Sequence, residues 1–321
     1  MLRSLALGSR KRASAALLNA TTAASARSFF SGSGSGSYNS ALAAASFSTL
    51  SNNNNSNSSS GGSSNRSGVG RLAVTLSAPD ARPVLYVCDV QETFRPPVLP
   101  QLPAVIVGAR ALMQIARALD MPVFVSEQRP FKPTVAELRT LYDPAATGDA
   151  AAATSAPTST PAGASGVPRA APGVTVVGDS EVAFAAEGLH PVTLLHKSSF
   201  SMLGDGHAPR LLAGYPRAVV LAGIEGHVCV LQTARDLLQR GVSVWLPADA
   251  VASSDPAACA VALEQLRADG AVITTVESVA FELMGTAKNP AFKSVIAVIK
   301  DLKKRKDELA AATAAAAAGK Q

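Results

Sequence analysis

The sequence predicts an α/β protein in which an open, doubly wound sheet lies between layers of helices. Short and solidly apolar runs recur along the chain, as expected for central strands of a parallel sheet that is covered on both faces. Amphipathic segments with helical spacing separate many of these runs, and a repeated strand–helix–strand order favours parallel strands. Such sheets bind ligands outside the carboxyl ends of their strands, so functional residues are expected there.

Each predicted strand is a run of apolar, often β-branched residues that is too short for a typical helix. The six strands are expected at residues 84–88, 123–126, 192–195, 218–222, 242–246 and 271–275. The helices are expected where apolar residues follow helical spacing, at 104–119, 181–188, 228–240 and 256–268. All these elements fall within one predicted domain, residues 80–300.

Residues 1–31 have the composition of a mitochondrial transit peptide. They are rich in Arg, Ser, Ala and Leu and contain no acidic residue, which suits a basic amphipathic helix. The motif Arg27-Ser-Phe-Phe-Ser31 suits presequence cleavage, whereas the apolar runs are too interrupted for a secretory signal. We therefore predict a mitochondrial protein, with a disordered basic tail as the alternative.

Three other segments offer little to bury. Residues 32–79 are rich in Ser, Asn and Gly, which predicts a disordered linker. Residues 144–172 are rich in Ala, Thr, Pro and Gly, which predicts an insertion in a surface loop. Residues 301–321 are charged and then alanine-rich, which predicts a C-terminal tail, although a helix from Phe292 could extend into it.

The basic character of the chain belongs to its N-terminal part. Seven of the 29 basic residues precede Asp80, the first acidic residue, so 22 basic residues face 23 acidic ones in the remainder. Nucleic-acid binding needs a basic surface on the folded part, so the composition argues against a nucleic-acid partner. No run approaches the roughly 20 apolar residues of a membrane-spanning helix, which predicts no membrane association.

A cysteine lies where an apolar strand gives way to a helix. The turn Gly223-Ile-Glu-Gly-His-Val-Cys229 follows the strand at 218–222. Backbone N–H groups without intrahelical partners and the positive end of the helix dipole favour a thiolate there and could stabilise an oxyanion. Cys229 is therefore a candidate nucleophile, although free cysteines are often simply buried.

Two charged residues follow other strands of the predicted sheet. Asp89 follows the first strand and Lys197 follows the third. Because the carboxyl ends of parallel strands meet at one edge, we expect Asp89, Lys197 and Cys229 to lie together. An ammonium group favours the thiolate, and a carboxylate can accept the thiol proton and later return it. The predicted reaction is acyl transfer to the cysteine followed by hydrolysis, although each residue alone also has a structural explanation.

Three sequence blocks resemble the signature motifs of the isochorismatase-like cysteine hydrolases. They are Val87-Cys-Asp-Val-Gln-Glu-Thr-Phe-Arg-Pro96, His196-Lys-Ser-Ser-Phe-Ser-Met202 and Gly223-Ile-Glu-Gly-His-Val-Cys-Val-Leu231. The likeness covers about residues 83–300 apart from the predicted insertion, and it is greatest to the eukaryotic isochorismatase-domain-containing proteins.

The resemblance implies a three-layer, Rossmann-like α/β/α fold with a six-stranded parallel sheet. It implies that Asp89, Lys197 and Cys229 form a catalytic triad. It also implies a cis peptide between Ile224 and Glu225, and an oxyanion hole formed by the N–H groups of Glu225 and Cys229. The expected activity is hydrolysis of a carbon–nitrogen bond in a small amide through a cysteine thioester, by a protein that forms homo-oligomers.

Two departures from the family pattern refine this prediction. The nicotinamidase branch holds zinc with one Asp and two His after the second strand, whereas residues 126–133 contain no histidine. A zinc site built from His227 and Cys229 would need two further ligands that the sequence does not offer, so we predict neither a metal nor an organic cofactor. Gly226 stands where many relatives have Thr, so the floor of the site is expected to differ.

Five more residues are candidates for the substrate pocket. The two Phe side chains could form apolar walls, and the Gln could donate to a substrate carbonyl. The Glu could hold a substrate amine or orient Lys197, with a structural salt bridge as its alternative. These candidates are Gln91, Phe94, Glu127, Phe200 and His227.

Two other functions stay open. The chain could be a catalytically silent binding or assembly protein on the same fold, including one that associates with RNA in mitochondria, because a fold does not fix a function. It could also be a redox-responsive protein, which would require a disulfide partner for Cys229. Strand alternation points Cys88 away from Asp89 and towards the core, so no such partner is expected at the site.

Overall fold

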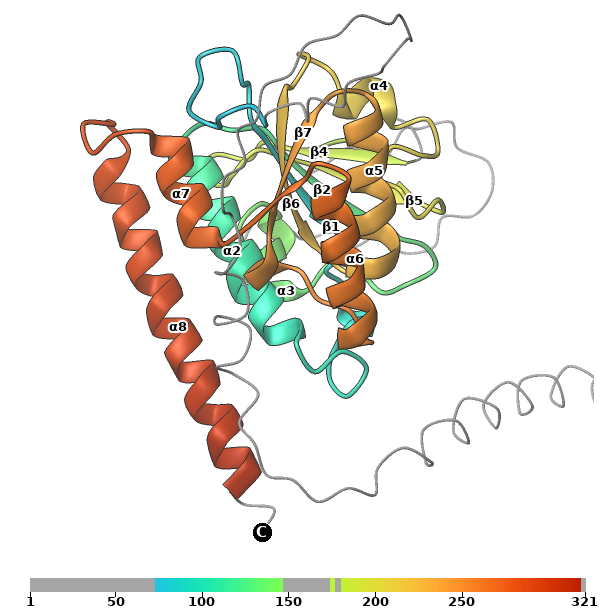
Figure 1. The fold of residues 1–321 in the computed structure, drawn as a ribbon, viewed down its shortest axis with the longest axis vertical. Coiled ribbons are helices and arrows are strands. Elements are labelled where there is room, and N and C mark those ends of the chain that lie inside the picture. Colours follow the sequence, from blue (N-terminus) through green and yellow to red (C-terminus); the bar gives the residue numbers. More distant parts are fainter. Residues whose placement is uncertain (1–72, 147–173, 177–179, 319–321) are drawn as a thin grey trace, which may run out of the picture. The chain divides into compact units, whose positions relative to one another are not determined.

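An eight-stranded sheet lies between two layers of helices in a computed structural model, which describes residues 73–146, 174–176 and 180–318 (Figure 1). The strand order is β3-β4-β5-β2-β1-β6-β7-β8. Six strands are parallel: β1 (Val84–Cys88), β2 (Val123–Gln128), β5 (Val192–Lys197), β6 (Ala218–Gly223), β7 (Ser243–Pro247) and β8 (Val272–Thr274). Two antiparallel strands, β3 (Val174–Val176) and β4 (Glu181–Phe184), extend the sheet beyond β5.

The predicted fold class is confirmed, and each of the six predicted strands is present. The sheet differs from the prediction by the two antiparallel strands. The helix predicted at 181–188 is wrong, because Glu181–Phe184 forms β4 and pairs with β5. A sheet edge exposes unpaired N–H and C=O groups, so pairing with β5 outweighs the weak helical tendency of this segment.

Alternate residues of the central strands enter two separate cores. Leu85 and Val87 pack with residues of α2 (Leu102–Ala118), α7 (Val276–Met284) and α8 (Phe292–Ala318). Tyr86 and Cys88 pack with residues of α5 (Leu231–Gln239) and α6 (Pro256–Ala268). Figure 1 shows these two helix groups on opposite sides of the sheet, which is the expected three-layer arrangement. The shorter helices are α3 (Ala136–Arg139) and α4 (Ala208–Leu211).

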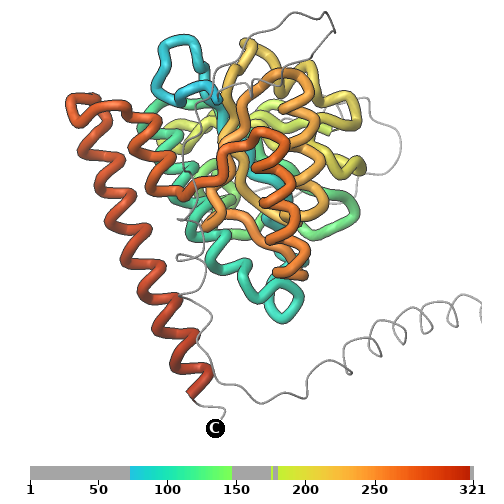
Figure 2. The backbone as a smooth tube through the Cα atoms, in the orientation of Figure 1, coloured from blue at the N-terminus to red at the C-terminus, as the bar shows by residue number. Residues whose placement is uncertain are grey.

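The C-terminal helix α8 packs along α2 (Figure 2). Its residues Val295, Ile299 and Leu302 are buried, and the Lys306 Nζ atom lies 2.5 Å from Asp249 Oδ2. The segment from residue 301 to 318, predicted as a tail, therefore continues this helix. An apolar stripe at helical spacing explains why the helix holds to the domain.

Contacts with the domain begin before Asp80. The Val74 N–H donates to Ser243 Oγ at 2.9 Å, Trp245 Nε1 donates to the Val74 carbonyl at 3.2 Å, and Leu76 is buried. The end of the segment predicted as a linker thus packs on the domain. The predicted leader 1–31, the remaining linker and the predicted insertion from residue 147 onwards lie outside the described residues.

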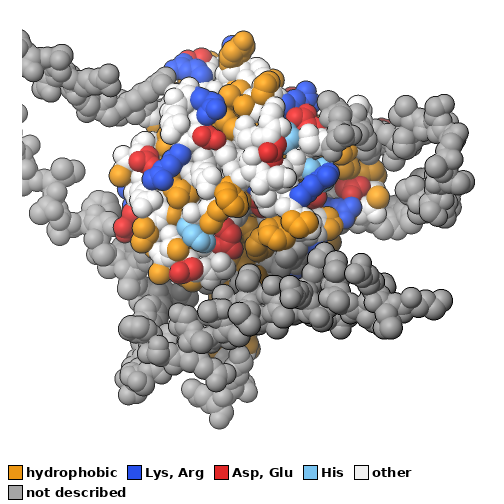
Figure 3. Space-filling model, turned by 90° about the vertical axis from the view of Figure 1, so that its right-hand side faces the viewer, with side chains coloured by type: hydrophobic (Ala, Val, Ile, Leu, Met, Phe, Trp, Pro, Cys, Tyr) orange, Lys and Arg blue, Asp and Glu red, His pale blue; other side chains and the backbone are white. Residues whose placement is uncertain are grey.

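Figure 3 shows one face of the molecule, on which basic, acidic and hydrophobic side chains are interspersed. This mixture agrees with the near balance of charge after residue 79. Within the described ranges, no helix combines the length and the apolar composition needed to cross a membrane.

Candidate active site

Asp89 follows β1 in an unusual backbone conformation. Its φ angle is 54°, in the left-handed region that Asp tolerates better than most residues. Its N–H donates to the Ser126 carbonyl of β2 at 3.1 Å. The side chains of Cys88 and Asp89 consequently lie close together, and the Cys88 thiol donates to Asp89 Oδ2 at 3.5 Å. In a regular strand they would point to opposite faces of the sheet.

A buried ion pair joins Asp89 to Lys197, which ends β5. The Lys197 Nζ atom lies 2.7 Å from Asp89 Oδ2. It also donates to Gln128 Oε1 at 2.6 Å and to the carbonyls of Ser199 and Phe200 at 3.1 and 3.0 Å. The ammonium group has three protons to donate, so these acceptors satisfy it without solvent.

The surroundings of Lys197 hold its positive charge. Burial alone would lower its pKa, but attraction to Cys88, Asp89 and Cys229 together outweighs burial, so the pKa of Lys197 is raised. The ammonium group is also close to the Cys88 thiol, because both bind the same oxygen, Asp89 Oδ2. A fixed cation in a buried site stabilises a thiolate more than it would in water.

Cys229 lies in a π-helical turn, Gly226–Val230, that leads directly into α5. The Ile224–Glu225 peptide bond before this turn is cis. The chain enters the turn in close contact with β1: a Cβ atom at Gly223, whose φ is 127°, would lie 2.0 Å from the Cys88 carbonyl oxygen. Only glycine fits this approach, which brings the start of the turn against Cys88. The Cys229 residue is 7% exposed.

Cys88 is part of the same site. The Cys229 side chain lies beside its thiol, and burial, this neighbour and the charge of Asp89 raise the pKa of Cys88 well above its usual value. Both cysteines belong to one buried cluster. The prediction that Cys229 has no neighbouring cysteine is therefore wrong. The positive φ at Asp89 and the close approach of Gly223 to Cys88 bring the two cysteines together.

The loop after β7 fixes the turn that carries Cys229. The Gly226 N–H donates to the Ala252 carbonyl at 2.9 Å, and the His227 N–H donates to Ser253 Oγ at 3.3 Å. The Glu225 carboxylate accepts from both the N–H and the hydroxyl of Ser254, at 2.8 and 3.2 Å. The Glu225 side chain thus binds the loop after β7. Only the backbone N–H of Glu225 is left to hold an oxyanion.

Gly226 leaves no room for a larger residue. A Cβ atom there would lie 2.7 Å from Cys259 Sγ, 3.0 Å from Val251 Cγ1 and 3.1 Å from Ser253 Oγ. The Cys259 side chain of α6 therefore occupies space that a side chain at position 226 would need. Position 226, at the floor of the site, is where this sequence has Gly and many relatives have Thr.

The structure gives Gln91 and Glu127 positioning roles. Gln91 is buried and donates to the carbonyls of Gln128 and Lys132 at 3.2 and 2.7 Å, while its Oε1 accepts from the Gln128 N–H at 3.0 Å. The carboxylate of Glu127 accepts from the N–H and hydroxyl of Thr134 at 2.6 and 2.8 Å. Both residues therefore hold the segment after β2, and neither contacts Lys197 Nζ through a hydrogen bond among the described residues.

The remaining pocket candidates are partly open to solvent. Phe200 is 52% exposed. Phe94 packs edge-to-face on Phe131, with ring centroids 5.2 Å apart. His227 is partly exposed, and its Nδ1 atom lies 3.6 Å from Glu225 Oε2.

Three positioning residues were not singled out from the sequence. Ser126 Oγ donates to Asp89 Oδ1 at 2.7 Å, and Gln128 accepts from Lys197 and donates to the Ser198 carbonyl at 2.8 Å. Asp205 accepts from the N–H groups of Ser198 and Ser199, which fixes the loop after Lys197. One sequence signal could have identified Ser126 and Gln128: both lie at the end of a predicted strand, at the edge of the sheet where ligands are expected.

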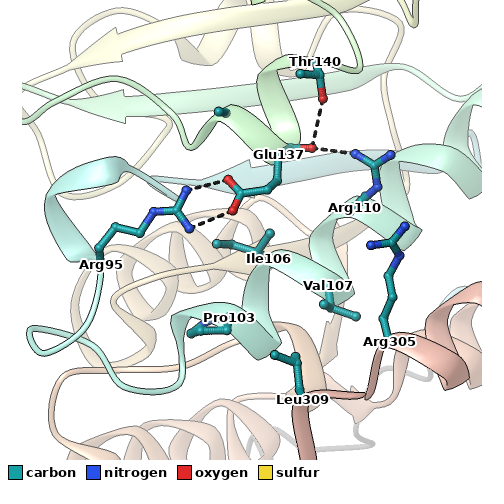
Figure 4. Close-up of a pocket in the computed structure, with 10 residues that line it drawn as sticks. Arg95, Pro103, Ile106, Val107, Arg110, Glu137, Thr140, Arg305 and Leu309 are labelled. Carbon is teal, nitrogen blue, oxygen red and sulfur yellow. Dashed lines mark hydrogen bonds and ion pairs between the residues drawn. The ribbon is translucent and has the colours of Figure 1, made fainter. Parts of the chain in front are cut away.

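Among the described residues, no group of three or more His, Cys, Asp or Glu side chains is placed to share a metal ion. A site without metal or cofactor stays a prediction. A cavity of about 520 Å³ lies between α2, α3 and α8 (Figure 4), and none of the candidate site residues lines it. Three of its charged groups bind one another: Arg95 pairs with Glu137 at 2.5 Å, and Arg110 donates to the Glu137 carbonyl at 2.7 Å. The fourth, Arg305, pairs with Asp301 at 2.7 Å.

The chain is similar to known proteins over the part that contains this site. A family profile described as the isochorismatase domain matches residues 83–278. The secreted isochorismatase effector Isc1 of Phytophthora sojae is 36% identical over 220 residues, which cover 68% of this chain and 84% of that protein. Isochorismatase domain-containing protein 2 of Danio rerio is 33% identical over 232 residues, covering 71% and 89%. The solved structure of MAR1 ribonuclease from Caenorhabditis elegans has a TM-score of 0.50 at 29% identity, covering 68% of this chain and 90% of that one.

Proposed function

The chain belongs to the isochorismatase family of hydrolases, and we propose that it cleaves a carbon–nitrogen bond of a small amide through a thioester on Cys229. The observation that carries this proposal is the buried Asp89–Lys197 ion pair beside a cysteine at a strand-to-helix turn. The pair supplies a carboxylate and a fixed positive charge, and the turn supplies backbone donors.

In the proposed reaction, Asp89 accepts the proton of the Cys229 thiol, and the thiolate attacks the amide carbon. The N–H groups of Glu225 and Cys229 hold the oxyanion of the tetrahedral intermediate. Collapse of this intermediate breaks the carbon–nitrogen bond, and Asp89 returns its proton to the leaving nitrogen. A water molecule, deprotonated by Asp89, then hydrolyses the thioester and frees Cys229.

Lys197 acts in this scheme through its charge. Its Nζ atom is held by Asp89, Gln128 and two backbone carbonyls, so it has a fixed position and stays protonated. A fixed charge needs no reorganisation when the thiolate forms. Lys197 therefore stabilises the thiolate and keeps the Asp89 carboxylate in place.

A screen of small amides and imides tests the proposal, with wild type compared with Cys229→Ala. Cys259→Ser is the matched control, because Cys259 is a buried cysteine that makes no contact with the ion pair in the hydrogen bonds described. We expect Cys229→Ala to lose activity by a factor on the order of 10³ or more, while the control stays active. Full activity of Cys229→Ala on an amide that wild type hydrolyses would contradict the thioester mechanism.

One observation favours a second function, which is association with RNA. The chain is 29% identical to a C. elegans protein described as a ribonuclease. The near balance of 22 basic and 23 acidic residues after residue 79 weighs against a large RNA-binding surface. Alkylation by iodoacetamide near neutral pH separates the two functions. A silent RNA-associated protein would react at Cys229 no faster than free cysteine does, whereas the hydrolase reacts faster.

We further propose import into mitochondria and self-association into a homo-oligomer. The acid-free, Arg- and Ser-rich residues 1–31 support import. Import assays with and without these residues test the first proposal, and light scattering of the purified chain tests the second. Processing by isolated mitochondria and a mass above 32.6 kDa are the expected results.

A further inference from the structure

The proposed reaction leaves one buried nucleophile unused, the thiol of Cys88. Cys88 ends β1 opposite Gly223 of β6, and its carbonyl accepts from the Ile224 N–H at 2.9 Å. The turn that carries Cys229 thus starts against Cys88. The two side chains are neighbours in one buried cluster, and a disulfide requires that their sulfur atoms approach to roughly 2.05 Å.

The two thiols differ in their access to solvent. Cys229 is 7% exposed, whereas Cys88 is wholly buried. Burial and the neighbouring Cys229 and Asp89 raise the pKa of Cys88, so Cys88 stays protonated at neutral pH. A dissolved oxidant therefore meets Cys229 first. Cys88 is protected from direct oxidation, because the thiolate is the form that reacts.

We propose that Cys88 is the resolving thiol of Cys229, so that a hydroperoxide converts the pair into a reversible disulfide. The Cys229 sulfur attacks the terminal peroxide oxygen, the O–O bond breaks, and Cys229 becomes a sulfenic acid while an alcohol, or water from hydrogen peroxide, leaves. The Cys88 sulfur then attacks the Cys229 sulfur, an S–S bond forms and the S–O bond breaks. The hydroxyl leaves as water with the Cys88 proton. Two electrons pass from the thiols to the peroxide.

The neighbours of Cys88 suit this second step. Asp89 Oδ2 accepts the hydrogen bond of the Cys88 thiol at 3.5 Å and can accept its proton as the S–S bond forms. Lys197, whose ammonium group binds the same Asp89 oxygen, stabilises the thiolate that attacks. The disulfide stops the proposed hydrolase while protecting Cys229 from irreversible oxidation to the sulfinic acid. This inference rests on Cys229 being the reactive thiol of the proposed function.

Treatment of the full chain with a small molar excess of hydrogen peroxide tests the proposal. Remaining thiols are blocked with N-ethylmaleimide, and peptides are analysed by mass spectrometry without reduction. The matched variants are Cys88→Ser and Cys259→Ser, with Cys88→Ala as a second variant if circular dichroism shows that the first does not fold. In wild type and Cys259→Ser we expect a Cys88–Cys229 cross-linked peptide that dithiothreitol removes. In Cys88→Ser we expect sulfenic and then sulfinic acid at Cys229.

Three results would overturn the proposal: sulfinic acid at Cys229 of wild type without a cross-link, a cross-link to Cys259 instead, or no oxidation of Cys229 at all. The readout is a mass and does not depend on activity. A cross-link in a chain that hydrolyses no amide would thus refute the proposed function alone. Amide hydrolysis without a cross-link would refute the disulfide alone.

Discussion

The hydroxyl of Ser126 donates a 2.7 Å hydrogen bond to Asp89 Oδ1, while Lys197 binds Oδ2 of the same carboxylate at 2.7 Å. Each oxygen of Asp89 is therefore held by a different strand, β2 or β5. A carboxylate fixed at both oxygens cannot rotate away from the thiols. The orientation of the proposed base thus depends on a serine that has no chemical role of its own.

Replacing Ser126 with Ala should lower kcat about tenfold with little change in KM, because a hydrogen bond to a charged group contributes about 1.5–3 kcal/mol. The free energy of unfolding should fall by a similar amount. Ser126→Thr is the control, since it keeps the hydroxyl. Steady-state kinetics and urea unfolding measure both quantities. Equal kcat values for wild type and Ser126→Ala would show that Asp89 needs no such support.

Removing one member of the ion pair should destabilise the fold by about 3–5 kcal/mol, because the other charge stays buried. Lys197→Met should cost more than Asp89→Asn. Without Asp89, Lys197 still has Gln128 and two carbonyls as acceptors, whereas the carboxylate without Lys197 keeps only weaker donors. The double variant should cost less than the sum of the single variants in urea unfolding. Additive costs would mean that the two side chains are not coupled.

Gly226→Ala should destabilise wild type by about 1–3 kcal/mol, the usual cost of overpacking. The added Cβ atom would lie 2.7 Å from Cys259 Sγ, so the same change should cost less in a Cys259→Ala background. Thermal unfolding of the four proteins measures the difference. An equal penalty in both backgrounds would show that Val251 and Ser253, and not Cys259, limit the space.

The stability of the loop after Lys197, which Asp205 fixes, should depend on pH. Hydrogen bonds from Ser199 and Ser198 lower the pKa of Asp205 to about 2, against about 3.9 in an unfolded chain. A lowered pKa contributes stability above about pH 4, and this contribution is lost as the pH falls towards 2. The stability difference between wild type and Asp205→Asn should therefore shrink over that range. A difference that does not change with pH would contradict this assignment.

The sequence predicted the parallel part of the sheet because strands buried on both faces are solidly apolar, as in Ala218–Gly223. It failed where pairing decides the structure. The segment from Glu181 contains residues that suit either a helix or a strand, and only its contact with β5 selects the strand. The C-terminal helix was underestimated for a related reason, since its partner α2 lies far away in the sequence.

The candidate site was predictable where the chemistry depends on residue type. Asp89 and Lys197 could be placed together because both follow parallel strands, and they form an ion pair in the structure. The role of Cys88 could not be predicted by strand alternation, because φ at Asp89 is 54°. Ser126 was missed although it lies at a strand end in the predicted binding edge, and Asp205 was missed because its hydrogen bonds depend on the fold of the loop after Lys197.

The positive φ of Asp89 links the evolution of positions 88 and 89, because it affects where the neighbouring Cys88 thiol lies. Asn and Gly also accept a positive φ. Replacement of Asp89 by either residue would therefore keep the path of the chain and the position of the Cys88 thiol. A β-branched replacement such as Asp89→Val would turn the chain and move the neighbouring thiol with it. Mutations at these two positions should therefore be strongly epistatic, even though only one of the two side chains takes part in the proposed hydrolysis.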